Sequence, residues 1–162
     1  MLIYHKITEE EKFLISEWKY CGNYEIYNNA PYEVQKEKGS GFANPQNNFY
    51  SFYDKNILIG YINLREKDNR VSLGIGVHPQ YCNKGYGQQI VSIACKIAET
   101  LFGEKLLELE VRTWNTRAIR CYEKSGFHIE GTAFHKTTPI GEGQFYRMVT
   151  RTVRCSRSKL VK

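Results

Sequence analysis

The segment with the clearest chemical potential is a glycine-containing loop, Cys82-Asn-Lys-Gly-Tyr-Gly87, between a strand-like and a helix-like stretch. Gly85 and Gly87 let the backbone curl so that successive N–H groups point toward a common centre. The first amides of a helix have no acceptor within the helix, and the helix dipole adds positive potential there. The loop therefore predicts a site for phosphate or pyrophosphate, although a tight strand-to-helix turn would use the same glycines.

This loop does not match the two best-known classes of nucleotide-binding loop. The nucleoside-triphosphate sequence G-x-x-x-x-G-K-[ST] is absent from the chain,. The dinucleotide fingerprint lacks its third glycine, because Ile90 stands at that position. Other parts of the sequence must therefore indicate which phosphorylated ligand the loop binds.

The strand-like segment before the loop, residues 71–77, has one face of very small residues. Alternation along a strand separates Ser72, Gly74 and Gly76 from Leu73, Ile75 and Val77,. A face this small suits the close approach of a ligand or of another backbone. Glycines that accommodate a packed helix would explain the pattern equally well.

Two motifs resemble the GCN5-related N-acetyltransferase (GNAT) superfamily. The loop resembles the family sequence R/Q-x-x-G-x-G/A, with Cys82 where arginine or glutamine is usual. A later segment, Asn115 to Phe127, has the pattern N-x-x-A-x-x-x-Y-E-K-x-G-F and follows the strand-like Leu109-Glu-Val-Arg112. With the strands around them, the motifs cover about residues 57–127. The residues before 49 match no pattern of the family.

The resemblance implies that acetyl-CoA is the co-substrate and that a neutral amine attacks its thioester directly. The backbone of residues 75–77 would hold the acetyl group and pantetheine, residues 82–89 the pyrophosphate, and Asn115 the pantetheine arm. The implied cofactor-binding residues are Ile75, Gly76, Val77, Cys82, Asn83, Lys84, Gly85, Tyr86, Gly87, Gln88, Gln89 and Asn115. Because the family loop grips pyrophosphate mainly through backbone amides, we expect cysteine at position 82 to be tolerated.

The resemblance also implies that Tyr122 protonates the departing thiolate. Tyr122 lies seven residues after Asn115, about two helical turns, so both face the same side of a helix,. Transfer from a phenol of pKa about 10 to a thiolate of pKa about 8.5 is uphill by roughly 2 kcal/mol. A nearby positive charge or a water relay would have to supply the difference. A core tyrosine on an amphipathic helix is the alternative interpretation.

Deprotonation of the acceptor is the main obstacle to direct attack. At pH 7 it costs about 4.6 kcal/mol for a lysine-like amine and about 1.4 kcal/mol for an α-amino group. Glu110 is the candidate general base, because Leu109-Glu-Val-Arg112 resembles the corresponding run of ribosomal-protein alanine acetyltransferases. Glu110 could equally be an exposed strand carboxylate that pairs with Arg112 or with a cross-strand partner. Glu66 is a weaker candidate base.

The cysteines and histidines predict no further chemistry. The chain has five cysteines with no C-x-x-C pair, so neither a disulfide framework nor a zinc site is expected,. A covalent route through Cys82 or Cys121 would need a thiolate of low pKa beside a base, which adjacency to His78 does not establish. We expect no metal and no acetyl-enzyme intermediate.

The surrounding periodicity predicts an α/β (α+β) fold: a mixed, mostly antiparallel central sheet with helices on both faces. The expected strands are residues 2–6, 49–53, 57–64, 71–77, 106–111, 128–136 and 144–153. Strands 71–77 and 106–111 should be parallel, and the last two should join at Gly141-Glu-Gly143. Helices are expected after a capping box at Thr8–Glu11, with Phe13, Leu14 and Trp18 on its apolar face, and at 32–38, 85–102 and 115–125,.

These elements predict a single acetyltransferase domain over residues 1–154. Its N-terminal half would be 2–64, with an acceptor-side segment at 20–48. An acetyl-CoA-binding core at 71–127 and closing strands at 128–154 would follow. Residues 155–162 would form a basic tail.

The composition of the chain limits the classes of function that it can have. The 162 residues carry a net charge of +6, and no stretch is apolar enough for a membrane span,. We therefore expect a cytoplasmic N-acetyltransferase without a membrane partner, acting on a peptide N-terminus, a polyamine or another small amine. A homodimer is compatible with the sequence. An inactive CoA-binding module and a basic protein associated with RNA or the ribosome are the alternatives, although a nucleic-acid partner is not expected.

Overall fold

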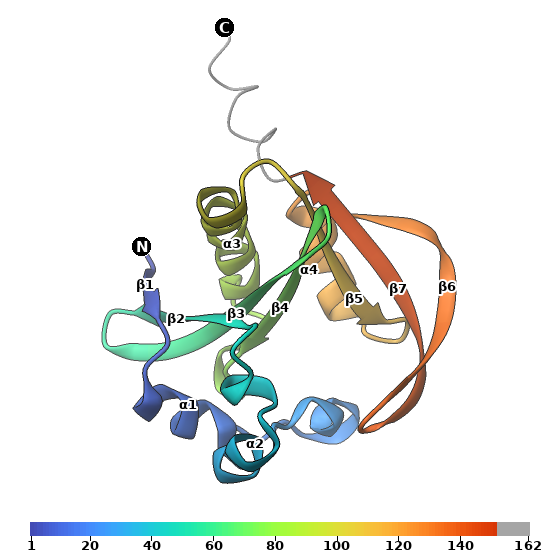
Figure 1. Cartoon of the computed structure of the whole chain (residues 1–162). Helices are drawn as coiled ribbons and strands as arrows, with labels where there is room; N and C mark the ends of the chain where they lie inside the picture. The colour runs from blue at the N-terminus through green and yellow to red at the C-terminus, as the bar shows by residue number, and fades with distance from the viewer. Residues whose placement is uncertain (152–162) are drawn as a thin grey trace, which may run out of the picture. The chain divides into compact units, whose positions relative to one another are not determined.

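The computed structural model describes residues 1–151 (Figure 1). Seven strands form one mixed sheet in the order β1-β2-β3-β4-β5-β7-β6, which confirms the predicted fold class. The strands are β1 (Ile3–Lys6), β2 (Asn48–Asp54), β3 (Ile57–Lys67), β4 (Arg70–Val77), β5 (Leu106–Arg112), β6 (His128–Thr138) and β7 (Gly141–Arg151). The predicted basic tail and the last two residues of the predicted strand 144–153 lie outside the described residues.

Four α-helices agree with the predicted positions. They are α1 (Glu9–Ser16), α2 (Tyr32–Lys38), α3 (Tyr86–Phe102) and α4 (Thr116–Lys124). The sequence did not predict three short 3₁₀ helices: η1 (Gly22–Tyr27), η2 (Gly41–Ala43) and η3 (Pro79–Tyr81). Segments of three to six residues are too short to show a helical apolar period.

The chain divides into two compact units, which are described in turn. The first contains residues 1–65 and 75–90, and the second contains residues 66–74 together with the chain from residue 91 onward. Strand β4 and helix α3 each contribute residues to both. The predicted division into a single domain with three parts stays a prediction.

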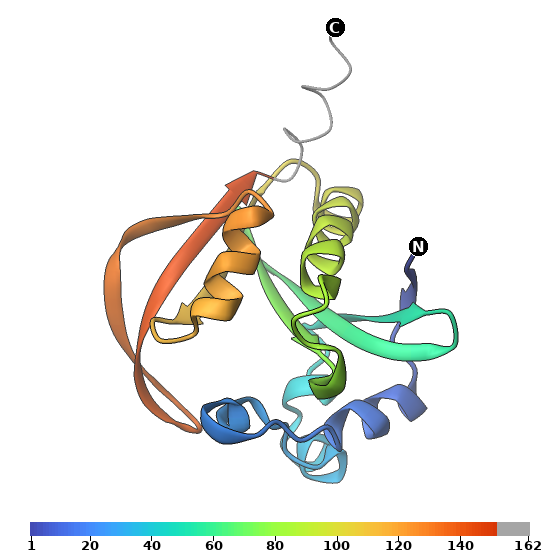
Figure 2. The same cartoon turned by 180° about the vertical axis from the view of Figure 1, so that it is seen from behind.

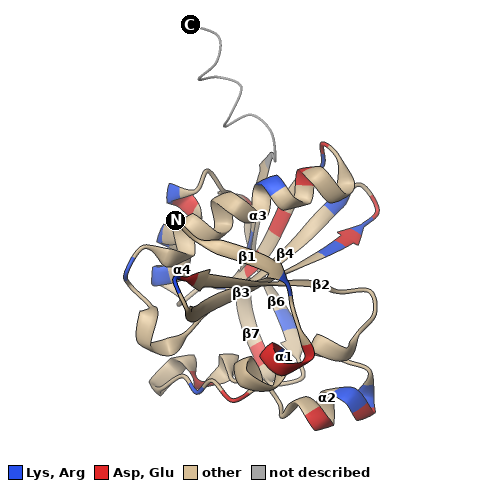
Figure 3. Ribbon diagram, turned by 90° about the vertical axis from the view of Figure 1, so that its left-hand side faces the viewer, with Lys and Arg blue, Asp and Glu red and all other residues tan. Residues whose placement is uncertain are grey.

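In the first unit, antiparallel strands β1, β2 and β3 support α1 and α2. Residues Lys6 and Tyr50 pair between β1 and β2, and Asn48 pairs with Leu64 between β2 and β3. Figure 3 shows the acidic first turn of α1 in red and basic residues at the end of α2 in blue. Both charge placements complement the helix dipoles.

Helix α1 starts at the predicted capping box but buries a different face. The Thr8 hydroxyl accepts from the Glu11 amide at 3.2 Å, and the Thr8 amide donates to the Glu11 carboxylate at 2.9 Å. Phe13 and Leu14 are exposed, at 40% and 46%, whereas Glu11 and Ile15 are buried. The predicted apolar face is therefore wrong for Phe13 and Leu14, whereas Trp18, just after the helix, is buried. The helix turns Glu11 inward because that carboxylate has hydrogen-bond donors on β1 and β2.

The Glu11 carboxylate is the centre of a buried polar network. It accepts from Ser51 Oγ at 2.9 Å and from the Tyr53 hydroxyl, and it contacts His5 Nε2 at 2.9 Å. Burial on its own raises the pKa of this carboxyl, but the donors from Tyr53, the Thr8 amide and Ser51 outweigh it and lower the pKa below 4.5,. Burial and the bond to Glu11 in turn raise the pKa of Tyr53 to about 12.

We expect Glu11→Gln to destabilise the protein by about 2 to 4 kcal/mol, because an amide brings N–H donors to a site already surrounded by donors. The ionised Glu11 stabilises the native state fully above its unfolded-state pKa, and that stability is lost as pH falls through the lower folded-state pKa. Urea unfolding from pH 7 to pH 3 should therefore show a smaller acid-induced loss in the variant. The exposed neighbour Glu10 provides the control, Glu10→Gln, which should behave like the parent; equal curves for all three would contradict this role.

In the second unit, β5 is the central strand. It runs parallel to β4 from Arg70↔Leu106 to Ser72↔Glu108, as predicted, and antiparallel to β7. Figure 2 shows α4 lying along one face of β5 and β7. The Asn115 side chain caps α4 by accepting from the Ala118 amide at 3.2 Å, and Gly126 follows the helix with φ +95°. Both helix boundaries follow the sequence signals.

The hairpin between β6 and β7 turns two residues earlier than predicted. Thr138 pairs with Gly141, so Pro139 and Ile140 form the turn and Gly143 lies within β7. The predicted Gly141–Gly143 turn is therefore wrong. Proline has no N–H for a ladder and fixes its own φ, so it ends β6 before the glycines are reached. None of the helices within residues 1–151 is long and apolar enough to cross a membrane.

Candidate functional site

The predicted anion-binding loop curls at Gly85 as expected, but its second positive φ is at Asn83, because Gly87 is already part of α3. Asn83 and Gly85 adopt positive φ angles of 62° and 83°, and both are exposed together with Lys84. The first backbone bond of α3 runs from the Gln89 amide to the Gly85 carbonyl at 3.4 Å. Amides that precede Gln89 in the helix therefore have no acceptor within it. This end of α3 can bind an anion through backbone N–H groups.

Side chains from within the first unit hold this loop. The Tyr86 hydroxyl donates to Asp54 Oδ2 at 2.5 Å, and that bond raises the pKa of Tyr86. The Cys82 thiol lies 3.6 Å from the His78 carbonyl and 3.8 Å from the Val77 carbonyl, as a weak donor to both,. Cys82 therefore anchors the start of the loop to the end of β4.

The end of β4 is also held by an aromatic side chain that the sequence did not single out for this role. The Tyr20 hydroxyl donates to the Val77 carbonyl at 2.7 Å. His78 Nδ1 accepts from the Gln80 amide at 3.1 Å, and its ring packs edge-on against Trp18 with centroids 4.8 Å apart. Burial lowers the pKa of His78. A neutral imidazole with its Nδ1 occupied cannot use that nitrogen as a base.

The small face of β4 accommodates an aromatic ring. A Cβ added to Gly76 would lie 2.3 Å from Tyr61 Cε1, on the neighbouring strand β3. On the opposite face of β3, a Cβ on Gly60 would lie 2.6 Å from Ile90 Cδ1 of α3. From the sequence, the group that lies close to Gly76 could have been a ligand, another backbone or a packed helix. The group that occupies this space is the Tyr61 ring.

Gly76→Ala should therefore lower the free energy of unfolding by about 1 to 3 kcal/mol, because the added methyl group overlaps a ring that cannot move freely. Tyr61 is confined by Trp18, Phe42 and Phe49, at centroid distances of 6.0, 5.6 and 6.2 Å. Chemical denaturation measures the effect. Unchanged stability would show that the ring can be displaced at no cost.

The last residues of β4, Ile75–Val77, are the segment where the resemblance places the acetyl group. Within the second unit, the parallel ladder between β4 and β5 covers Arg70–Ser72 of β4. Backbone N–H groups of a strand can donate to a bound carbonyl oxygen.

Asn115 and Tyr122 lie on α4 in the second unit. Asn115 is buried, and its side-chain oxygen is engaged in capping the helix. Tyr122 is half-buried, and its ring centroid lies 6.1 Å from that of Phe127. The sequence places both on one side of the helix, and their predicted roles toward the cofactor stay predictions.

Both candidate bases form ion pairs within the second unit. Glu110 is bonded to Lys136 Nζ at 2.6 Å and lies 3.6 Å from Arg147 Nη2, directly across the ladder between β5 and β7. Glu66 is bonded to Lys105 Nζ at 2.6 Å. The observed pairs match the alternative of a cross-strand partner for Glu110.

Arg112 does not pair with Glu110. Its guanidinium is buried over the Phe145 ring, 4.7 Å from the centroid. It donates weakly to the Glu142 carbonyl and to Thr138 Oγ1, each at 3.4 Å. Arg112 therefore supports the β6–β7 hairpin.

The Cys121 thiol shows no sign of nucleophilic activation. Burial raises the pKa of Cys121, and Lys124 opposes that only in part. Cys21, Cys82, Cys95 and Cys121 form no disulfide within the described residues. Residues 1–151 contain no group of three or more His, Cys, Asp or Glu side chains that could hold a metal ion.

Comparisons with known proteins identify the class. The sequence matches the model of the Acetyltransferase (GNAT) family over residues 12–127. The chain therefore belongs to this family and is an N-acetyltransferase. No curated protein sequence matches it.

Solved structures with a similar fold are N-acetyltransferases as well. The spermidine N-acetyltransferase of Vibrio cholerae, solved with CoA and spermine, is 20% identical, with 93% of this chain and 95% of that chain covered and a TM-score of 0.74. A chimera of the Vibrio cholerae enzyme with hSSAT is 19% identical, with 99% of each chain covered and a TM-score of 0.74. The ribosomal-protein-S18-alanine N-acetyltransferase of Escherichia coli is 18% identical, with 94% of each chain covered and a TM-score of 0.67.

Proposed function

We propose that this enzyme transfers the acetyl group of acetyl-CoA to a primary amine, by direct attack of the neutral amine on the thioester. The observation that carries the proposal is the loop at the start of α3, where Asn83 and Gly85 adopt positive φ angles before a 17-residue helix. In the proposal, the amides of residues 82–89 hold the pyrophosphate of the co-substrate. The backbone of residues 75–77 holds its acetyl and pantetheine part.

In the same proposal, Tyr122 donates its phenolic proton to the CoA thiolate, and Asn115 contacts the pantetheine arm. Bond formation between the amine nitrogen and the acetyl carbon breaks the C–S bond, so the electron pair leaves on sulfur and the phenolic proton neutralises it. The nitrogen then releases one proton to solvent, and solvent restores the phenol, so the products are the N-acetylated amine and CoA with a neutral thiol. Because burial raises the pKa of Cys121, an acetyl intermediate on that cysteine is not part of the mechanism.

The ion pairs of Glu110 affect which class of amine the enzyme can acetylate. A carboxylate bonded to Lys136 and close to Arg147 can accept a proton only by giving up part of that pairing, directly or through a water,. A polyamine or lysine needs about 3 kcal/mol more deprotonation at pH 7 than an α-amino group. The spermidine enzymes among the similar structures favour a polyamine. A peptide α-amine is the second candidate. The ion pair of Glu110 favours it, and so does the similarity to the ribosomal-protein-S18-alanine N-acetyltransferase.

A panel assay separates these acceptors. Acetyl-CoA is incubated with spermidine, spermine, peptides with free α-amino groups, aminoglycosides and amino acids, while thiol release and the mass of one added acetyl group are followed. Acetylation of an amine supports the proposal and identifies the class. Saturable binding of CoA without turnover on any acceptor would instead support an inactive CoA-binding module, and no binding of acetyl-CoA would reject the proposal. We also propose a cytoplasmic location, where acetyl-CoA would be available.

A further inference from the structure

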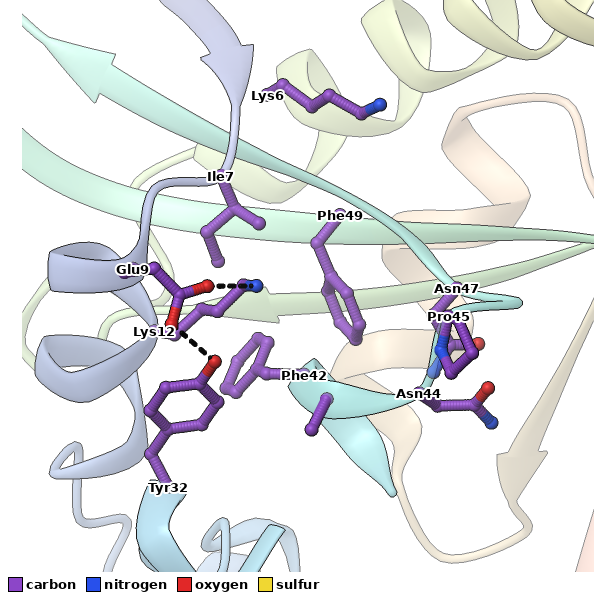
Figure 4. Close-up of a pocket in the computed structure, with 11 residues that line it drawn as sticks. Lys6, Ile7, Glu9, Lys12, Tyr32, Phe42, Asn44, Pro45, Asn47 and Phe49 are labelled. Atoms are coloured by element: carbon purple, nitrogen blue, oxygen red, sulfur yellow. Dashed lines mark hydrogen bonds and ion pairs between the residues drawn. The ribbon is translucent and has the colours of Figure 1, made fainter. Parts of the chain in front are cut away.

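A pocket of about 400 Å³ lies in the first unit, apart from the residues assigned to the cofactor (Figure 4). It is built by the end of β1, the start of α1, the start of α2, η2 and the start of β2. None of residues 75–77 or 82–89 contributes to its lining. Its size is that of a pocket for a small organic molecule.

The wall of the pocket nearest the sheet is aromatic. Phe42 and Phe49 line it, with ring centroids 4.6 Å apart and planes inclined by 55°. Phe42 is buried, and Phe49 is half-buried. Such a surface favours a flat or branched apolar group.

The net charge of the pocket lining favours binding of an anion. Lys12 Nζ is bonded to Glu9 at 2.7 Å, and the Tyr32 hydroxyl donates to the other oxygen of Glu9 at 2.7 Å, as the dashed lines in Figure 4 show. These bonds lower the pKa of Glu9, with the Lys12 bond the largest cause, so the pair stays ionised and is neutral as a whole. The side-chain ammonium of Lys6 has no hydrogen-bond or ion-pair partner within residues 1–151. The lining therefore carries one uncompensated positive charge.

Two amides add directional groups on the side of the pocket opposite Glu9. The Asn44 oxygen accepts from the Gln46 amide at 3.0 Å, and the Asn47 side-chain nitrogen donates to the Gly41 carbonyl at 2.9 Å. These bonds fix the orientation of both side chains. The Asn44 amide nitrogen is then a donor and the Asn47 oxygen an acceptor for a polar group in the pocket.

From this arrangement we propose that the pocket is a second ligand site, for a small monoanion with a carboxylate on an apolar ring-sized body. The carboxylate binds Lys6 and the amide of Asn44, and the apolar body lies on Phe42 and Phe49. A polyamine does not fit the lining, because its several positive charges would face Lys6 and Lys12.

The site is linked to β4 through one ring. Phe42 and Phe49 both contact Tyr61, which packs on Gly76 with no room for a Cβ. A ligand that displaces the two phenylalanine rings would therefore also displace the Tyr61 ring, which packs against residues 75–77. This coupling rests on the proposed function of β4 in holding the acetyl group, whereas the binding site itself does not.

Phenylacetate is the probe, and phenethylamine is its cationic counterpart with the same ring. The full chain, without acetyl-CoA, is titrated while backbone amide resonances are followed by NMR. Phenylacetate should shift the resonances of Ile7, Ala43 and Asn47 saturably. Lys6→Met should weaken its binding about tenfold, the loss of one charge-assisted contact. Lys38→Met removes the same charge from the exposed end of α2 and should leave binding unchanged.

Several results would overturn the proposal. They are equal or tighter binding of phenethylamine or spermidine, binding unaffected by Lys6→Met, or shifts confined to residues 82–89. A separate arm measures acetyl transfer with saturating phenylacetate, which should change the KM for acetyl-CoA about threefold or more. An unchanged KM in an active enzyme removes the coupling to β4. Binding at the pocket by a chain that shows no transfer would count against the proposed function alone.

Discussion

Tyr122→Phe is expected to lower kcat for acetyl transfer by about 100-fold or more, with little change in the KM for acetyl-CoA. General acid catalysis contributes roughly 10²- to 10⁴-fold, and this substitution removes only the acidic hydroxyl group. The phenylalanine keeps the ring beside Phe127, so the fold of α4 should be preserved. A loss confined to kcat indicates an interaction made in the transition state.

The measurement is steady-state kinetics from pH 7 to pH 9, with thermal unfolding as a check on the fold. Tyr4→Phe is the matched control: Tyr4 is exposed on the edge strand β1, where its ring stacks on Phe52 at 5.6 Å. That variant loses the same chemical group and should keep the activity of the parent. Full activity of Tyr122→Phe at every pH would show that another group protonates the thiolate.

The long elements were predictable because local signals and tertiary packing agree. Helix α3 has a clear apolar period, a glycine loop before it and Gly103 with φ +78° after it. Helix α4 has Asn115 as its cap and Gly126 as its end. In α3 the periodicity already indicates which face is buried, with Ile90, Ala94 and Ala98 on it,.

Helix α1 shows where this reasoning fails. Its capping box was predictable, but its apolar residues Phe13 and Leu14 are exposed and the charged Glu11 is buried. The helix orientation is decided by donors from Ser51 and Tyr53, about 40 residues away in the chain. A sequence pattern does not show that a carboxylate will find such partners.

The candidate site also has a part that local sequence signals predict and a part that they do not. In the loop at residues 82–87, the positive φ of Gly85 was predictable from a glycine before a helix, whereas the positive φ of Asn83 was not. The ion pairs of Glu110 depend on the register between β5 and β7 and on the long strand β6. The Tyr20 bond to the Val77 carbonyl joins residues 57 positions apart. Long-range pairing of this kind determines whether a carboxylate is available as a base, and the sequence does not encode it locally.

Gly85→Ala is expected to raise the KM for acetyl-CoA about tenfold, which corresponds to 1.4 kcal/mol of lost binding. Gly85 has φ +83°, and an added Cβ would meet no protein atom within 4 Å. The substitution therefore acts through the backbone, because alanine disfavours this conformation by about 1 to 2 kcal/mol. A loop that relaxes toward negative φ no longer directs its amides at a common centre.

Gly103→Ala separates binding from stability. Gly103 lies at the other end of α3, with φ +78° and no atom within 4 Å of an added Cβ, so it carries the same backbone strain. Both variants should lose a similar amount of stability, about 2 to 4 °C in Tm per kcal/mol. Only Gly85→Ala should weaken binding of acetyl-CoA, measured by isothermal titration alongside the kinetics. Because the two substitutions match in chemistry and strain, equal affinities would mean that the amides of residues 82–89 do not hold the pyrophosphate.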